Sequence, residues 1–376
     1  IWIFVYLLVF TSCISSLNEE RTWSVYKADS ESTSYSPLNQ INKENVNQLQ
    51  VAWMFRPDDA PEGSHFGRSE CNPIVIDGVM YFTSLRHRVY AANASNGQQK
   101  WTFDPFDGEM GGGVSRGVTY WEDKNSKRIL FTAGDQLFAL EASTGKLITS
   151  FGVGGKVNLN IGLRGDPKSI SVIPTSPGIV YKDLLILGSE VSELYGAEPG
   201  YIRAYNIESG KLEWTFHTVP WPGELGYETW PKDAWKYVGG VNDWGGMSSD
   251  EERGMVFLAL GSPSYDYYGA DRKGENLFGN CVVALDARTG RYIWHYQTVH
   301  HDLWDYDLPA PPNLVTLERD GKKLDAVAQT SKTGFLYVLD RETGEPLFPI
   351  EERKVPASNI PGEETWPTQP YPIKPL

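Results

Sequence analysis

The sequence of 376 residues has only three cysteines and no run of lysine and arginine. Cys13, Cys71 and Cys281 cannot form a disulfide framework, and whether Cys71 pairs with Cys281 is open. Acidic residues outnumber basic ones by 48 to 34, which gives a formal net charge of −14. The basic surface that binds phosphate backbones is therefore lacking, and we expect no nucleic-acid partner.

Sustained apolar periodicity of the helical kind is also lacking, because Gly, Pro, Asp and Asn interrupt the chain about every ten residues. Aromatic residues are instead abundant, at 13 Trp, 20 Tyr and 15 Phe. So many rings need a packed core, which excludes a disordered chain. Short apolar segments between turn residues predict an all-β fold.

The chain opens with an uncharged segment. Residues 1–18 contain no charged side chain, and their densest apolar part precedes Thr11, Ser12 and Cys13. This pattern resembles a secretory signal or, through Cys13, a lipoprotein anchor, and a membrane-spanning helix is the alternative. We expect residues 1–18 to be a signal or anchor, incomplete at its N-terminus. We then expect residues 19–376 to be exported. They would be either free in the periplasm or attached to the membrane on its periplasmic side.

A repeat runs through the rest of the chain. Five segments share alternating apolar residues, a polar turn and a second apolar run, with the turn glycine at Gly97, Gly145, Gly210, Gly290 and Gly344. Glycine permits a positive φ, so the pattern predicts hairpins. Trp101, Trp214 and Trp294 follow their glycines by four residues, where a large ring can pack against the next unit. Repeats of this kind indicate four-stranded blades that stack radially, because one blade cannot bury both faces.

Three segments carry a family resemblance: the hairpin from Ala284 to Trp294, SRGVTYW from Ser115, and HHDLWDYDLP from His300. They resemble the quinoprotein dehydrogenases, eight-bladed β-propellers that use pyrroloquinoline quinone (PQQ). The likeness runs from about Trp23 to the C-terminus. It is strongest to the membrane-type glucose dehydrogenases, since the alcohol dehydrogenases usually have Arg where Lys332 stands. Five hairpins and a proline-rich tail fit a propeller truncated to about five or six blades, with the C-terminal blades missing.

The resemblance implies two catalytic residues. Asp305 would be the base that takes the substrate hydroxyl proton and would also be a metal ligand, and Lys332 would donate to a quinone oxygen. Without the resemblance, Asp302, Asp305 and Asp307 are equally well interpreted as loop acids of an acidic protein.

The resemblance also implies a metal ion, Ca²⁺ or Mg²⁺, held by oxygen ligands. Glu193 and Ser262 match two metal-binding positions of the family, with Glu190 and Glu198 as alternatives to Glu193. The family usually has Asn where Ser262 stands. A serine hydroxyl is a poorer ligand than an amide oxygen, so either the Ser262 carbonyl or Asp266 would replace it.

The remaining implied residues bind PQQ. Trp244 would form the floor beneath the quinone, and Arg116 would pair with a cofactor carboxylate. Thr175, Glu70 and Lys332 would complete the contacts. Glycines on both sides of Trp244 would let a flat ligand approach the backbone.

The implied function is hydride transfer from a sugar or alcohol to the quinone, with electrons passed to a respiratory quinone or cytochrome c. The main alternative is a non-enzymatic propeller lipoprotein of the outer-membrane assembly type, because fold alone does not fix function. Such a scaffold should lack the site residues named above. A secreted hydrolase with paired carboxylates is less favoured, because no acid with a raised pKa is identified.

Overall fold

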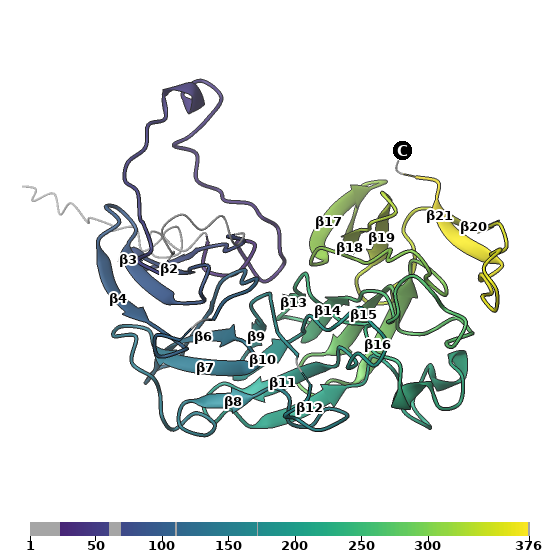
Figure 1. Ribbon diagram of the computed structural model, residues 1–376. Coiled ribbons are helices and arrows are strands. Elements are labelled where there is room, and N and C mark those ends of the chain that lie inside the picture. Colours follow the sequence, from purple (N-terminus) through teal and green to yellow (C-terminus); the bar gives the residue numbers. More distant parts are fainter. Residues whose placement is uncertain (1–22, 60–68, 110, 171, 375–376) are drawn as a thin grey trace, which may run out of the picture.

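The computed structural model describes residues 23–59, 69–109, 111–170 and 172–374 (Figure 1). The predicted signal or anchor, including Cys13, lies outside these residues. Within them the helical elements are three single turns of 3₁₀ helix, η2 (Val46–Gln48), η3 (Tyr227–Thr229) and η4 (Ala234–Lys236). No helix in these ranges is long and apolar enough to span a bilayer. The remaining elements are strands, which confirms the all-β prediction.

Four of the sheets have four antiparallel strands each, and every strand pairs with its neighbour in sequence. The first holds β1 (Ile74–Ile76), β2 (Val79–Thr83), β3 (Val89–Asn93) and β4 (Gln99–Phe103). The second holds β5 (Thr119–Glu122), β6 (Lys127–Ala133), β7 (Gln136–Glu141) and β8 (Lys156–Asn158). The third holds β9 (Ile179–Tyr181), β10 (Leu184–Leu187), β11 (Ile202–Asn206) and β12 (Leu212–Phe216). The fourth holds β13 (Ser248–Asp250), β14 (Met255–Ala259), β15 (Cys281–Asp286) and β16 (Tyr292–Gln297).

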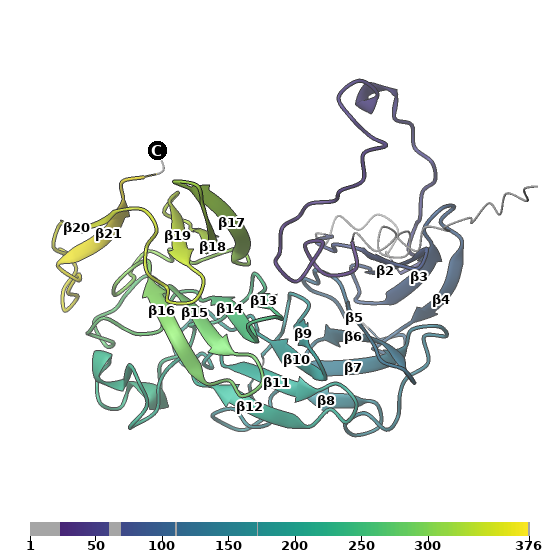
Figure 2. The same cartoon turned by 180° about the vertical axis from the view of Figure 1, so that it is seen from behind.

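Two smaller sheets follow. The fifth holds β17 (Asn313–Arg319), β18 (Lys322–Thr330) and β19 (Leu336–Asp340), and the sixth is the hairpin β20 (Ile350–Lys354) and β21 (Thr368–Pro372). Both views of the ribbon show the first five sheets following one another along an arc (Figures 1 and 2). This is the arrangement of propeller blades, and the number of blades in the complete ring stays a prediction.

The predicted turns are confirmed at all five glycines, and they join paired strands at Gly97, Gly210 and Gly290. Across the turns at Gly145 and Gly344 the described residues make only a single β-bridge each. The φ values of the five glycines lie between 70° and 76°, in the left-handed region that L side chains rarely adopt. The turns close in the same way: the Gly290 N–H donates to the Asp286 carbonyl and the Gly344 N–H to the Asp340 carbonyl, at 2.8 and 2.9 Å. Local sequence therefore fixes these turns.

Tryptophans connect neighbouring sheets. A Cβ on Gly344 would lie 2.5 Å from the Trp294 ring, and one on Gly290 would lie 2.5 Å from the Trp214 ring. Each indole also donates to a carbonyl of the next hairpin, Trp294 Nε1 to Arg341 O at 3.0 Å, for example. Trp101 packs on Gly145 in the same way, so the predicted packing is confirmed. Trp53, which lies before the first hairpin, does the same to Gly97 and was not indicated by the repeat.

The junction of the second and third sheets is different. Thr149 stands where three of the other repeats have tryptophan, and Gly210 packs directly on the backbone of Gly152. The Gly152 N–H donates to the Ser209 carbonyl at 2.9 Å. A backbone contact thus replaces the indole at this junction.

The core lies between adjacent sheets. One cluster joins the first and second sheets through Ala91 and Phe131, and another joins the third and fourth through Ile186 and Val283, all nearly inaccessible to water. Cys281 is buried in the second of these clusters, and both Cys71 and Cys281 are free thiols. The question of their pairing is answered: they do not form a disulfide.

Strand order places the candidate site at one end of the sheets. When two consecutive strands are antiparallel, the start of the first and the end of the second lie at the same end of the sheet. The predicted residues that precede a first strand are Arg116, Thr175, Trp244 and Asp305, and those that follow a second strand are Glu193, Ser262 and Lys332. The topology therefore delivers loops of four different sheets to one end of the molecule.

Candidate functional site

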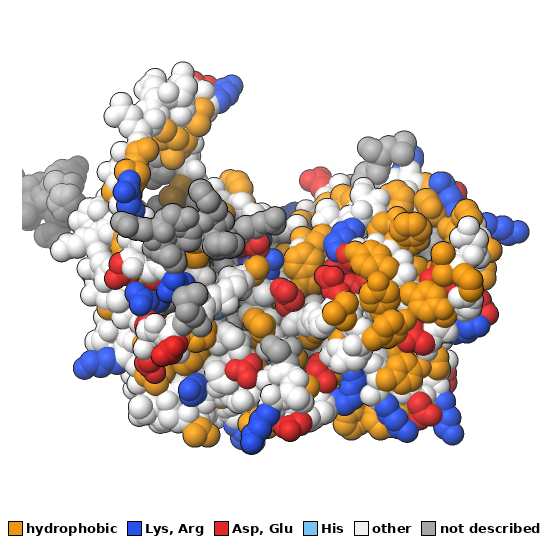
Figure 3. Space-filling view, in the orientation of Figure 1, with side chains coloured by type: hydrophobic (Ala, Val, Ile, Leu, Met, Phe, Trp, Pro, Cys, Tyr) orange, Lys and Arg blue, Asp and Glu red, His pale blue; other side chains and the backbone are white. Residues whose placement is uncertain are grey.

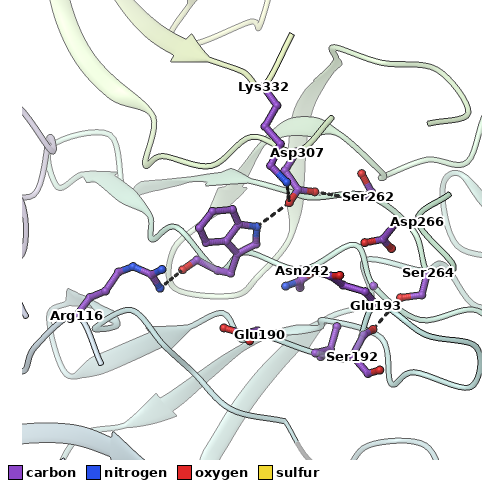
Figure 4. A pocket seen from close by; sticks show the side chains of 13 residues that line it. Arg116, Glu190, Ser192, Glu193, Asn242, Ser262, Ser264, Asp266, Asp307 and Lys332 are labelled. Carbon is purple, nitrogen blue, oxygen red and sulfur yellow. Dashed lines mark hydrogen bonds and ion pairs between the residues drawn. The ribbon is translucent and has the colours of Figure 1, made fainter. Parts of the chain in front are cut away.

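These loops enclose a cavity of about 270 Å³ (Figure 4). Its lining is mostly polar and consists of Arg116, Glu190, Val191, Ser192, Glu193, Gly240, Asn242, Trp244, Ser262, Ser264, Asp266, Asp307 and Lys332. Arg116 and Lys332 bring positive charge to this lining from different parts of the wall, and Glu190, Glu193, Asp266 and Asp307 bring carboxylates (Figure 4). Such a cavity suits a small ligand that carries several oxygens.

Arg116 is held in place by three contacts. Its Nη2 lies 2.8 Å from Glu70 Oε2, and its Nη1 donates to Thr175 Oγ1 at 2.7 Å and to the Trp244 carbonyl at 3.3 Å. The backbone N–H of Arg116 also donates to the Thr175 carbonyl. The structure thus brings Glu70, Arg116 and Thr175 together as a pre-oriented guanidinium at the cavity wall.

Trp244 presents a half-buried indole to the cavity. The Arg116 guanidinium lies 5.4 Å and the Lys332 ammonium 5.9 Å from the centre of its ring. Of the neighbouring glycines, Gly240 lines the cavity, but Gly245 and Gly246 have another role. A Cβ on Gly245 would meet the Pro309 carbonyl at 2.7 Å, and one on Gly246 would meet Tyr26 at 3.1 Å, so these glycines serve chain packing instead of ligand access.

Asp307 joins three elements of the site. Its Oδ2 accepts hydrogen bonds from Trp244 Nε1 at 3.0 Å and from the Lys332 ammonium at 2.9 Å, and its Oδ1 accepts from the Ser262 N–H at 2.7 Å. Because a carboxylate with several donors is fixed in orientation, Asp307 sets the positions of the indole and the lysine. From the sequence alone it was one of three loop acids; the Asp-x-Asp spacing was the available signal.

Asp305 reaches the cavity through Lys332. The ammonium of Lys332 lies 2.8 Å from Asp305 Oδ2, whereas Asp305 itself does not line the cavity. Burial raises the pKa of Asp305 to about 6 against the lowering effect of the Lys332 hydrogen bond, and Asp307 raises it further. Burial alone would lower the pKa of Lys332, but its bonds to the two aspartates raise it above the ordinary value. The lysine is therefore charged and the aspartate is mostly ionised at neutral pH.

Of the predicted metal-binding residues, Glu193 and Ser262 line the cavity and Asp305 does not. Glu193 is solvent-exposed, and Glu190 beside it has a pKa raised by burial and lowered by Arg116. Burial also raises the pKa of Asp266 to about 8, with Asp305, Asp307 and Glu193 adding to the rise. The Ser262 hydroxyl donates to Asp302.

No group of three or more His, Cys, Asp or Glu side chains is gathered for metal binding among the residues that the structure describes. Any cation therefore needs other oxygens as well. Asn242 lines the same cavity and donates its Nδ2 to the Ser189 carbonyl at 2.9 Å, which leaves its Oδ1 for a ligand. Sequence reasoning missed Asn242, because no spacing distinguishes it from other loop asparagines.

A second cavity of about 780 Å³ adjoins the first at Lys332, which lines both. Its walls are richer in aromatic side chains and include Trp304, Tyr306 and Phe335. Figure 3 shows hydrophobic side chains gathered over the part of the molecule that holds β15–β21. Tyr267 lines this second cavity and donates its hydroxyl to Asp305 Oδ2 at 3.4 Å. Lys332 thus lies where a polar and an apolar cavity meet, and Asp305 is in contact with Lys332 and Tyr267 there without lining either cavity.

Residues 23–376 match a PQQ family described as the glucose/ethanol/alcohol dehydrogenase β-propeller domain. The chain is 32% identical to quinoprotein glucose dehydrogenase of Escherichia coli (strain K12), over 94% of this chain and 46% of that protein. It is 31% identical to quinate/shikimate dehydrogenase (quinone) of Acinetobacter baylyi, over 96% and 48%. The crystal structure of quinohemoprotein alcohol dehydrogenase from Comamonas testosteroni superposes with a TM-score of 0.75 at 29% identity, covering 95% of this chain and 53% of that one. The chain thus spans about half the length of the curated relatives it matches.

Proposed function

Because this chain belongs to the PQQ-dependent dehydrogenase β-propeller family, we propose that the complete protein oxidises the CH–OH group of a sugar or alcohol with PQQ as acceptor. The observation that carries the proposal is the convergence of Arg116, Trp244 and Lys332, from loops of three different sheets, on one cavity. A scaffold propeller has no need of such a convergence, so the non-enzymatic alternative is not favoured.

The residues of the cavity fit the cofactor. Arg116, held from behind by Thr175, suits a carboxylate, the Trp244 indole suits the plane of a fused ring, and Lys332 suits a quinone oxygen. When bound, PQQ supplies an electrophilic carbonyl that accepts two electrons as a hydride. A calcium or magnesium ion with Glu193 and Asp305 among its ligands would complete the site.

The chain's own residues move the proton and hold the charge. Asp305, ionised at neutral pH, is the base for the substrate hydroxyl, and Lys332 keeps its carboxylate oriented. The Lys332 cation also stabilises negative charge on a nearby oxygen more strongly in this partly buried site than in water. Trp244, fixed through Asp307, excludes water from one side of the cavity.

Substrate and electron acceptor are proposed at a finer level. A glucose-like aldose or a simple alcohol is the substrate class, since the relatives are named for glucose, quinate/shikimate and alcohol oxidation. A respiratory quinone or cytochrome c would take the electrons. Export to the periplasm, with residues 1–18 as signal or anchor, would bring the protein to those acceptors.

The test is dye-linked oxidation of aldoses and alcohols by the complete gene product, supplied with PQQ and Ca²⁺. Asp305→Asn keeps the shape and removes the base, so we expect turnover to fall by about 10²- to 10⁴-fold while PQQ remains bound. Asp271→Asn, at an exposed position, is the matched control and should keep full activity. Undiminished turnover in Asp305→Asn would show that another group takes the proton.

A further inference from the structure

The polar groups of Ser262 are all hydrogen-bonded within the protein. Its N–H donates to Asp307 Oδ1 at 2.7 Å, and its carbonyl accepts from the Val241 N–H at 2.8 Å. Its hydroxyl donates to Asp302, whose Oδ2 also accepts from Asn280 Nδ2 at 2.8 Å. All three groups are committed to the fold, so the expected ligand at this position is used structurally.

Asp266, four residues later, is in the opposite situation. Its side chain lines the cavity, yet the residue is only 5% exposed. Within the described ranges, no hydrogen bond or ion pair reaches its carboxylate, whereas Asp305 and Asp307 share Lys332 and Glu70 pairs with Arg116. A buried carboxylate without a partner is costly, and proteins compensate such charges with a cation or a set of donors.

Two further oxygen donors share the lining with Asp266. Glu193 lies close enough to act on its charge, and the Asn242 amide, with Nδ2 bonded to Ser189, has its Oδ1 free for a ligand. Figure 4 labels Asn242, Glu193 and Asp266 among the side chains that line this cavity. Carboxylate and amide oxygens are what calcium binds in proteins, whereas zinc prefers nitrogen and sulfur.

We propose that Asp266, in place of Ser262, is a ligand of a hard, oxygen-preferring cation at this cavity, together with Glu193 and the Asn242 amide oxygen. The assignment rests on the proposed function, because the ion is the one that would accompany the cofactor. When a cation displaces its proton, Asp266 supplies a charged carboxylate where an amide or hydroxyl is expected, so the site should bind a cation more tightly than a serine ligand would allow.

The experiment is calorimetric titration of the complete gene product with Ca²⁺, with and without PQQ, alongside melting curves. Asp266→Asn should bind Ca²⁺ about tenfold or more weakly. It should also abolish the rise in melting temperature that Ca²⁺ causes in the unaltered protein. Asp271→Asn, which removes a charge from an exposed position of the same loop, should bind Ca²⁺ like the unaltered protein.

Ser262→Ala is the complementary variant, and we expect its Ca²⁺ affinity to be unchanged. The assignment is overturned if Asp266→Asn binds Ca²⁺ as tightly as the unaltered protein, if folded Ser262→Ala loses the ion, or if the unaltered protein binds no Ca²⁺ in either condition. Ca²⁺ binding that depends on Asp266 without any PQQ-dependent oxidation would instead contradict the proposed function and leave the ligand assignment intact.

Discussion

Arg116→Lys is the substitution that most directly tests the cofactor-binding role of the cavity. Lysine keeps the charge but cannot reproduce the planar fork that contacts Glu70 and Thr175 and presents a free edge to the cavity. A hydrogen bond between charged groups contributes about 1.5–3 kcal/mol. Loss of one such bond to a PQQ carboxylate should weaken PQQ binding by about 10- to 150-fold. The assay is titration of the tryptophan fluorescence with PQQ.

Arg164→Lys is its control. Arg164 is also a partly buried arginine that donates to backbone carbonyls, those of Ala197, Trp235 and Val238, but it does not line the cavity. Its substitution should reduce stability without changing PQQ affinity. The reasoning is refuted if Arg116→Lys binds PQQ as tightly as the unaltered protein. It is also refuted if Arg164→Lys loses as much PQQ affinity as Arg116→Lys, because the loss would then not depend on the cavity.

Other predictions concern the frame that holds the site. Gly344→Ala should lower the free energy of unfolding by about 1–3 kcal/mol more than Gly334→Ala in urea titrations. Both glycines have positive φ, but only a Cβ on Gly344 meets the Trp294 ring, while one on Gly334 meets nothing within 4 Å. Asp307→Asn removes the charge that pairs with Lys332, so PQQ-dependent turnover should fall at least tenfold with little change in far-ultraviolet circular dichroism; full turnover would show that Asp307 is dispensable.

The repeat and its turns are readable from sequence because their causes are local. A glycine at positive φ and an alternating apolar pattern act within ten residues, so the hairpins at Gly210 and Gly290 follow directly. Packing across sheets is less accessible. Trp53 packs on Gly97 but belongs to no complete repeat. At Gly210 the backbone of Gly152 takes the place of the expected tryptophan ring. Both partners are tens of residues away in sequence, so no local pattern identifies them.

The candidate site shows the same division. The resemblance named Arg116, Trp244 and Lys332, and the structure places them around one cavity. It did not indicate that Asp307 would accept hydrogen bonds from both Trp244 and Lys332. Nor did it indicate that the Ser262 hydroxyl would donate to Asp302. Hydrogen-bond partners of this kind depend on distances between loops that are tens of residues apart, and no pattern within one loop encodes them.

The layout of the site follows from the topology of the sheets. The site is built from residues just before the first strand of a sheet and just after its second strand. Antiparallel pairing brings these two points to the same end of the sheet. Loop residues can then change without disturbing the core, which lies between the sheets. The Ser262 hydroxyl, for example, is bound by Asp302, which Asn280 also contacts. A carboxylate at Asp266, two blades away from Arg116, can then take over the cation without moving the cofactor's anchor.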